Sequence, residues 1–143
     1  MAEQSYATHR QLVPMYHVVL ALLILATLIG SIVNLVRSVG SPGLYSASLI
    51  VALSIASTLL YVFCRSFALK AQDRAIRAEE QLRHYVLTGT LLDSRLTVKQ
   101  IVGLRFACDA EFAALARRAA EERLSPEAIK KAVATWRPDT YRA

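Results

Sequence analysis

Charged side chains of both signs are concentrated in residues 70–83, and a second group follows in residues 100–111. Such side chains predict either an ion-pair lattice that joins two helices or a solvated face, the usual role of charge on a helix. Opposite charges four residues apart, as in Asp73–Arg77 and Glu79–Arg83, each add about 0.2–0.5 kcal/mol to the stability of a helix. The candidate interaction residues are Gln72, Asp73, Arg74, Arg77, Glu80, Arg83, Arg105 and Asp109.

Catalytic and ligand-binding motifs are missing from the sequence. It has no G-x-S-x-G nucleophile, no phosphate-binding loop, no H-E-x-x-H and no paired cysteines. The histidines, His9, His17 and His84, lack enough neighbouring ligands for a metal, and interfacial hydrogen bonding is the better interpretation of the first two. Cys64 and Cys108 are expected to be buried core residues, with S-acylation of Cys64 as an alternative. We therefore expect no metal, no cofactor and no enzymatic activity.

The positive charge of the chain does not indicate a nucleic-acid-binding protein. The net charge is +6, and most of this excess lies after residue 64. Acidic residues alternate with the basic ones there, and no basic cluster is interleaved with aromatic residues. A basic segment of this kind is instead attracted to anionic lipid. We expect the lipid bilayer, and no nucleic acid, among the partners of the chain.

Two long apolar segments precede the charged residues and must position them. They are Met15–Val36, in which His17 is the only titratable side chain, and Leu44–Cys64, which carries no charge. A hydrocarbon core about 30 Å thick needs roughly 20 helical residues, and lipid allows only helices for such segments. The alternatives are a buried hairpin of a soluble protein and, for the first segment, a signal peptide. We expect an uncleaved two-helix transmembrane hairpin (15–64), with residues 37–43 as its outer loop.

The orientation of this hairpin follows from the basic residues that flank it. The outer loop contains only Arg37, whereas Arg65, Lys70, Arg74 and Arg77 follow the second segment. Basic residues favour the cytoplasmic side of a membrane. We therefore expect both chain ends, including the N-terminal segment 1–14, in the cytoplasm, at a bacterial inner membrane.

Small and weakly polar residues recur at helical spacing within both apolar segments. Such stripes let helices approach closely in lipid. They predict either that the two helices pack on each other through these residues or that the chain associates with further copies of itself. The candidate packing stripe consists of Ala26, Gly30, Asn34, Ser54 and Thr58, with Ala47 and Val51 continuing it on the second helix.

The second apolar helix is expected to continue as a cytoplasmic stalk over residues 65–87, because Arg65 to Val86 contains no helix breaker. Apolar residues recur there at spacings of three and four, which predicts a packing seam. The seam either docks onto the chain's own C-terminal helices or forms a coiled coil between subunits. We call this set the alanine seam: Ala68, Ala71, Ala75, Ala78, Leu82 and Tyr85.

Residues 88–143 are expected to form a small cluster of two to three cytoplasmic helices without strands. Thr88-Gly-Thr ends the stalk, and Thr97 with Gln100 forms a capping box for a helix that runs through Phe106. Asp109 is either an interior residue paired with Arg105 or the N-cap of a new helix, and we favour a break. The helical segment that follows Asp109 is expected to bury Phe112, Leu115, Ala116 and Ala119. Ser125-Pro-Glu starts the last helix, which should end near Trp136.

Short motifs that together are specific occur from end to end of the chain. They are Gln4-Ser5-Tyr6, His9, Pro14, Tyr16-His17, Ala68-Leu69-Lys70, Gln72-Asp73-Arg74, Ile76-Arg77, Glu79-Glu80, Leu82-Arg83, Leu96-Thr97, Gln100-Ile101, Leu104-Arg105-Phe106-Ala107, Asp109, Glu111, Ile129-Lys130, Trp136-Arg137, Asp139 and Tyr141-Arg142. With these motifs the chain resembles a group of small bacterial membrane proteins that share domain of unknown function 6526. This resemblance implies the two-helix membrane topology and supplies no activity. The chain has Thr8 and Cys108 where the family pattern has Asn and Ser, and the second departure argues against a thiol-dependent role.

Three functional hypotheses follow from the sequence. The first is a non-enzymatic scaffold, adaptor or accessory subunit that presents a cytoplasmic helical module to a protein partner or to itself. The second is a homo-oligomer that modulates transport. The third is an enzyme that acts on lipid headgroups at the membrane interface. Since neither apolar segment has an ionisable residue in its middle, the hairpin alone does not resemble an ion pathway.

Overall fold

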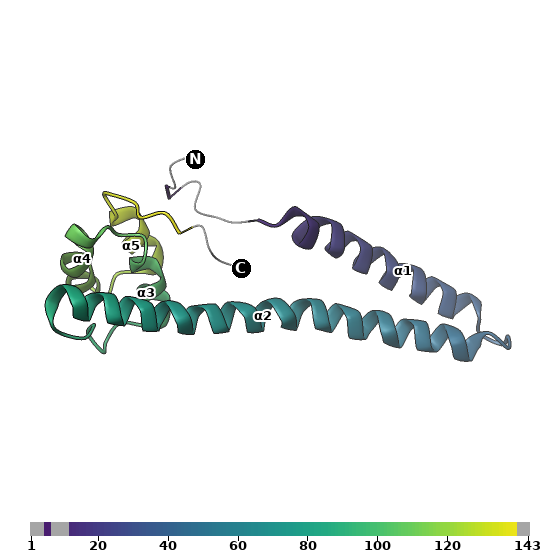
Figure 1. Cartoon of the computed structure of the whole chain (residues 1–143). Helices are drawn as coiled ribbons and strands as arrows, with labels where there is room; N and C mark the ends of the chain where they lie inside the picture. Colours follow the sequence, from purple (N-terminus) through teal and green to yellow (C-terminus); the bar gives the residue numbers. More distant parts are fainter. Residues whose placement is uncertain (1–4, 7–11, 140–143) are drawn as a thin grey trace. The chain divides into compact units, whose positions relative to one another are not determined.

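The computed structural model describes residues 5–6 and 12–139, and these are folded as helices without strands, as the sequence predicts (Figure 1). A short π-helix, η1, spans Met15–Leu20 and leads into α1, Ala21–Arg37. The other helices are α2, Leu44–Thr88, α3, Val98–Leu104, α4, Asp109–Glu121, and α5, Pro126–Ala132. The chain divides into two compact units, of which one is Leu12–Phe67 and the other is built on the chain from Ala68 onward.

The unit Leu12–Phe67 holds two helices that are long and apolar enough to cross a membrane. They begin at the predicted residues, Met15 and Leu44, and the first ends at Arg37, one residue beyond the prediction. Between them the backbone turns through Gly40, whose φ of +80° is a conformation that favours glycine. Within their most apolar stretches, only 6% and 11% of the residues are buried. The two helices therefore leave most of their apolar surface uncovered by the chain.

The small-residue stripe faces the neighbouring helix on α2 but not on α1. On α2, Ala47 and Ser54 are buried. On α1, the buried residue is Ser31, whereas Ala26, Gly30 and Asn34 are exposed. The prediction that the two stripes face each other is therefore wrong for α1. The larger side chains of Ile24, Leu28 and Leu35, which are partly buried, share the face of Ser31 and set the pairing instead.

Helix α2 is continuous from Leu44 to Thr88, which confirms that the second apolar helix runs on into the charged segment. It ends at Thr88, one residue beyond the predicted stalk, and Gly89 follows with a φ of +73°. The alanine seam, however, is exposed along its whole length, and the buried residues of this part of α2 are Ile76 and Glu80. The exposed seam therefore does not dock onto the chain's own C-terminal helices. Glu80 and Arg83, on another face of α2, contact Arg137, Asp109 and the Ala107 carbonyl instead.

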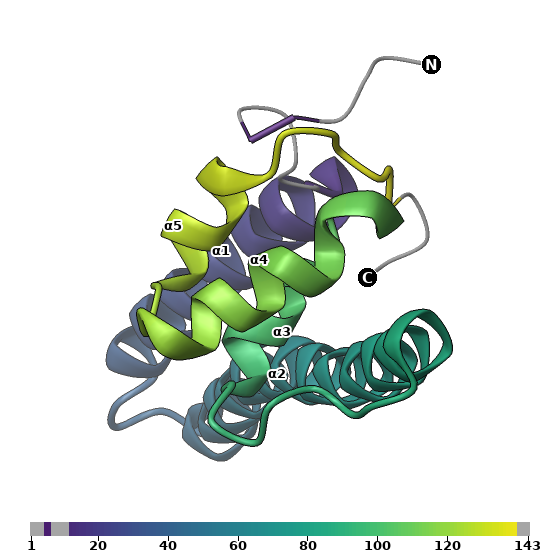
Figure 2. The same cartoon turned by 90° about the vertical axis from the view of Figure 1, so that its left-hand side faces the viewer.

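We call residues 68–139 the helical module, and its core lies among α3, α4 and α5 (Figure 2). The largest fully buried side chains are Phe106, Phe112, Ile101, Leu104 and Ile129. Trp136 packs on Phe106, with ring centroids 4.8 Å apart. The four residues predicted to be buried on α4 are buried, and Ala120 joins them. This core is closed by side chains of the module itself.

The starts of α3 and α5 agree with the caps predicted from sequence. The Thr97 N–H donates to Gln100 Oε1 at 2.8 Å, and the Gln100 N–H donates back to Thr97 Oγ1 at 3.3 Å. Ser125 Oγ accepts from the Ala128 N–H at 3.1 Å, with Pro126 in the first turn. Each cap satisfies an N–H group that the first helical turn leaves unpaired.

Helix ends were predicted less well than helix starts. α3 ends at Leu104, so Phe106 lies in a turn, and Cys108 rather than Asp109 is the N-cap of α4. The break near Asp109 is confirmed, but Asp109 is the first helical residue. α5 ends at Ala132, well before Trp136.

Pairing between distant backbone segments explains these differences. The Arg137 N–H donates to the Phe106 carbonyl at 2.7 Å, and the Cys108 N–H donates to the Thr135 carbonyl at 3.1 Å. The segment after α5 thus leaves the helix to pair with the turn between α3 and α4. The Glu111 carboxylate accepts the N–H groups of Ala134 and Thr135, both at 3.0 Å.

Candidate functional site

The most connected polar group of the helical module is the guanidinium of Arg83, on α2. Its Nη1 donates to Glu80 Oε2 at 2.9 Å, its Nε to Asp109 Oδ1 at 2.7 Å, and its Nη2 to the carbonyl of Ala107 at 2.7 Å. Its Cζ also lies 4.2 Å from the ring centroid of Phe112. We call these residues the arginine clamp, because one side chain of α2 joins the start of α4 and the turn before it.

Glu80 is the most buried acid of the clamp, with its side chain 6% exposed. A buried carboxylate is costly unless a cation neutralises it. Arg83 provides that cation, and Arg137 Nη1 lies 3.9 Å from the second carboxylate oxygen of Glu80. Asp109 is more exposed and stands in the first turn of α4, where negative charge is favoured by the helix dipole. The clamp is therefore an ion-pair lattice that stabilises the fold.

A small polar cleft of about 340 Å³ opens over this clamp, lined by Glu79, Glu80, Arg83, Asp109 and Arg137. Arg83 uses three of its five N–H groups in these contacts, one from each nitrogen. Glu80 and Asp109 are both bonded to that same guanidinium. Three of the five side chains that line the cleft are thus bonded to one another.

The structure brings together three of the eight candidate interaction residues: Glu80, Arg83 and Asp109. The predicted pair of Glu79 with Arg83 is wrong, because Arg83 turns to Glu80, three residues before it. Arg105 does not pair with Asp109 either. It lies 2.9 Å from Asp139 and over the ring of Phe106.

The other candidate residues remain on the surface of α2. Arg74 and Arg77 are exposed, and Gln72 and Asp73 are partly exposed. Among the described residues, none of these four has an ion-pair partner within 4 Å, so the predicted Asp73–Arg77 pair is absent there. The charged stretch thus divides into an internal lattice and an exposed surface.

Sequence reasoning missed two members of this site, Arg137 and the carbonyl of Ala107. Both reach the clamp only because the segment after α5 pairs with the turn before α4. No local spacing in the sequence indicates that pairing.

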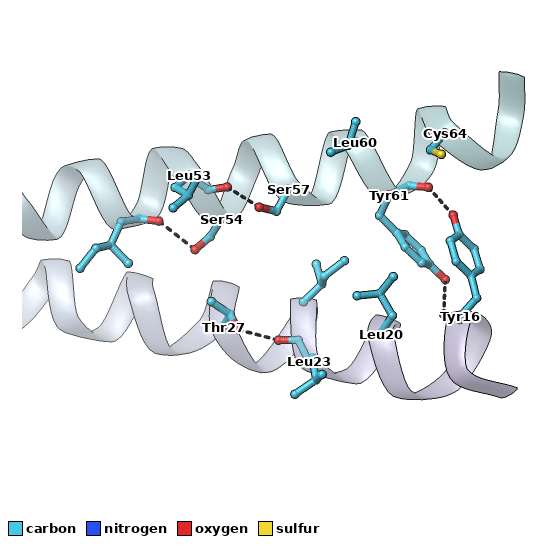
Figure 3. A pocket seen from close by; sticks show the side chains of 12 residues that line it. Tyr16, Leu20, Leu23, Thr27, Leu53, Ser54, Ser57, Leu60, Tyr61 and Cys64 are labelled. Carbon is cyan, nitrogen blue, oxygen red and sulfur yellow. Dashed lines mark hydrogen bonds between the residues drawn. The ribbon is translucent and has the colours of Figure 1, made fainter.

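An apolar groove of about 510 Å³ lies in the other unit, between η1–α1 and the first half of α2 (Figure 3). Tyr16 and Tyr61 stand at one end of it, with rings stacked 4.6 Å apart. The Tyr16 hydroxyl donates to the Tyr61 carbonyl at 2.6 Å. These tyrosines tie the start of the first apolar helix to α2.

The serine and threonine hydroxyl groups along this groove are bonded to their own helices. Thr27, Ser54 and Ser57 donate to backbone carbonyls at 2.7, 2.8 and 2.9 Å. The groove therefore presents an apolar surface rather than a polar path. Cys64 also lines it and is exposed, so the prediction of a buried core residue is wrong there; Cys108 is partly buried.

Two of the three histidines considered as metal ligands, His17 and His84, lie in the described part of the chain, and both are close to backbone groups. His17 Nδ1 lies within hydrogen-bond distance of the Val13 backbone, and His84 Nδ1 lies 2.8 Å from the Thr90 carbonyl. His9, like most of the N-terminal segment, lies outside the described residues. Within the described ranges, no three His, Cys, Asp or Glu side chains come together as a metal site.

The fold and the clamp define a class of all-helical proteins in which two long, apolar helices precede a small helical module held by buried ion pairs. The chain belongs to the family of unknown function DUF6526, whose model matches residues 1–143. Comparisons with curated proteins and with solved structures found no match. The family membership confirms the resemblance seen in the sequence and assigns no activity.

Proposed function

We propose that this protein is a two-pass membrane protein that holds a helical module at the cytoplasmic face of a bacterial inner membrane, where the module serves as a scaffold or adaptor. The observation that carries the proposal is the uncovered apolar surface of the two long helices. Leu22, Leu23 and Leu60, for example, are 60% or more exposed. In water such surface would be costly at about 25 cal/mol per Å². A lipid bilayer removes that cost.

The charge distribution supports the orientation. Only Arg37 is basic in the turn between the helices, whereas four basic residues follow Cys64 within 13 residues along α2. With two spans, a cytoplasmic C-terminal part places the N-terminus on the same side. The exposed side chains of Lys70, Arg74 and Arg77 would then lie near anionic headgroups, which attract them.

A binding role is supported by how the polar groups of the module are used. Glu80, Arg83 and Asp109 stabilise one another, so the most concentrated charge is not available for chemistry. The exposed surface of α2, in contrast, offers apolar groups such as Leu82 and the charged side chains of Arg74 and Arg77, which form no ion pair among the described residues. This contrast favours a scaffold over the lipid-headgroup enzyme, and the apolar groove gives no support to a transport path.

Extraction and purification test this proposal. Membranes from cells that express the full chain are washed with alkaline carbonate and then with mild detergent. We expect the chain to stay in the carbonate pellet, to dissolve in detergent, and to be purified together with a stoichiometric protein, either a partner or further copies. Release by carbonate would contradict the membrane proposal. Recovery as an isolated monomer would contradict the scaffold.

A further inference from the structure

The alanine seam is an exposed face of α2 that the module leaves without a partner. Helices α3, α4 and α5 lie on one side of the C-terminal half of α2 (Figures 1 and 2). Glu80 and Arg83 make the contacts of α2 with Arg137, Asp109 and the Ala107 carbonyl, while all six seam residues are exposed. Leu82 and Tyr85, the two large apolar members, are 64% and 53% exposed.

The seam has the spacing of a coiled-coil interface. Its residues follow one another at intervals of three and four over two and a half heptads, so Ala68, Ala75 and Leu82 take position a, and Ala71, Ala78 and Tyr85 take position d. Ile76, Glu80 and Arg83 fall at b and f, which face outward in a coiled coil. The chain's own helices thus cover the outward positions and leave the a and d positions open.

The charges that flank the seam are complementary to those of a second, parallel copy. Arg74 takes position g and Glu79 takes position e of the next heptad, and both side chains are exposed. In a parallel pair, a g residue of one helix faces the e residue five positions further along the other. Arg74 of each copy would therefore meet Glu79 of the other, which gives two symmetric ion pairs.

An antiparallel pair would lose this complementarity. There, g faces g and e faces e, so Arg74 could face only Phe67, Gln81 or another Arg74. Glu79 could face only Gln72, Val86 or another Glu79. No opposite charges would meet, and the charges therefore select the parallel arrangement.

We propose that α2 pairs with α2 of a second copy of this chain, in parallel, through the alanine seam. The inference rests on the proposed membrane location, because two copies inserted in the same sense in one membrane necessarily have parallel α2 helices. Alanine at most a and d positions lets the two helix axes approach to the lower end of the usual 8–10 Å. An alanine seam this short is a weak interface in water, and confinement in a membrane raises the effective concentration of the second copy.

Disulfide crosslinking in native membranes tests the pairing. In the full chain carrying C64S and C108S, Ala71→Cys and Ala78→Cys each place one thiol at a d position. The Cα atoms of paired d residues in a parallel pair lie within the roughly 4.4–6.8 Å that a disulfide spans. We expect a crosslinked dimer from each variant after mild oxidation, and none from the control Arg77→Cys, which is exposed on another face of α2.

An exchange of charges distinguishes specific pairing through the seam from crosslinks that form when two chains collide at random in the membrane. Arg74→Glu or Glu79→Arg alone should lower the dimer yield of the A78C chain about tenfold, because two attractive contacts become repulsive. The double variant R74E/E79R should restore it. Co-expressed R74E and E79R chains should pair with each other rather than with themselves, since both contacts between them are attractive.

Each other outcome overturns the pairing. It fails if A71C and A78C stay monomeric in the carbonate-resistant membrane fraction, and the proposed membrane location would then still hold. It also fails if R77C crosslinks equally well, if R74E has no effect, or if the adduct is a different protein instead of a second copy. Loss of the chain from the membrane fraction is a separate result and contradicts the proposed function itself. Emission of the single tryptophan, Trp136, which packs on Phe106, verifies that each variant is folded.

Discussion

The guanidinium of Arg83 illustrates how much one side chain organises in the helical module. It bonds to Glu80, to Asp109 and to the Ala107 carbonyl, and its flat face lies over Phe112. A lysine at this position would offer a point charge and could not satisfy three acceptors in one plane. The clamp thus depends on arginine geometry as well as on positive charge.

Replacement of Arg83 should therefore destabilise the module strongly. Arg83→Met leaves the buried carboxylate of Glu80 without its cation, and we expect the free energy of unfolding to fall by about 3 kcal/mol. Arg77→Met, at an exposed position of the same helix outside the seam and its flanking charges, should change it by less than about 0.5 kcal/mol. The measurement is thermal unfolding in detergent, followed by Trp136 emission. Equal effects of the two substitutions would contradict the role of the clamp.

Asp93 and Arg95, in the loop between α2 and α3, form a pair in which the Asp93 carboxyl group has an unusually low pKa. The side chain of Arg95 and then its backbone N–H donate hydrogen bonds to the Asp93 carboxylate, and they lower its pKa from 3.8 to about 2. Since the folded pKa lies below the unfolded one, this contact stabilises the fold above pH 4. Its contribution is lost as the pH falls from about 4 to about 2.

Carboxyl-carbon NMR can follow this titration directly. In the intact chain, the Asp93 signal should titrate with a pKa of about 2. In Arg95→Ala, the pKa should move back toward 3.8 but not fully, because the backbone N–H of residue 95 still donates to the carboxylate. An unchanged titration in that variant would show that Arg95 does not cause the shift.

Among the helices, α3 and α5 pack closely because α3 carries a glycine at their contact. A Cβ atom on Gly103 would lie 3.3 Å from the Pro126 carbonyl oxygen and 3.5 Å from Ile129. A backbone oxygen cannot move aside as easily as the end of a flexible side chain. Gly103 therefore allows this close packing, although glycine weakens an isolated helix.

Gly103→Ala should for this reason be destabilising. Helix propensity alone would favour alanine by about 1 kcal/mol, whereas the steric cost of overpacking is about 1–3 kcal/mol. We expect a net loss of unfolding free energy of about 1 kcal/mol. The control is Ala114→Gly on the exposed face of α4, which measures the difference in helix propensity between alanine and glycine alone. A more stable G103A variant would show that α5 yields at this contact.

The sequence predicted the helices well because their signals are local. The two apolar segments, the capping box of Thr97 and Gln100, and Ser125 before Pro126 each act within a few residues. The ends of α3 and α5 were missed because backbone pairing across the module decides them. The packing face of α2 was missed because side-chain contacts of Glu80 and Arg83 with residues distant in the sequence decide it. Of the candidate site, Glu80, Arg83 and Asp109 were named from charge density alone, but their mutual contacts depend on the fold.

At the scale of the whole molecule, the chain separates two tasks. One unit offers lipid-compatible apolar surface, and the other is a module with its own core and a buried ion-pair lattice. Helix α2 belongs to both, so any partner that binds its exposed seam would act on the same helix that enters the proposed membrane span. Stability and binding then depend on different faces of one helix.

The proposal of a two-pass hairpin with a cytoplasmic module is tested by measuring the orientation of the chain in a membrane. In the C64S/C108S background, Ser41→Cys marks the turn between the two apolar helices, and Ser94→Cys marks an exposed position of the module. Intact bacterial cells are treated with a maleimide that does not cross the inner membrane, after the outer membrane has been made permeable. We predict labelling of S41C in intact cells, and labelling of S94C only after lysis. Labelling of both cysteines in intact cells, or of neither before lysis, would contradict the two-pass hairpin with a cytoplasmic module.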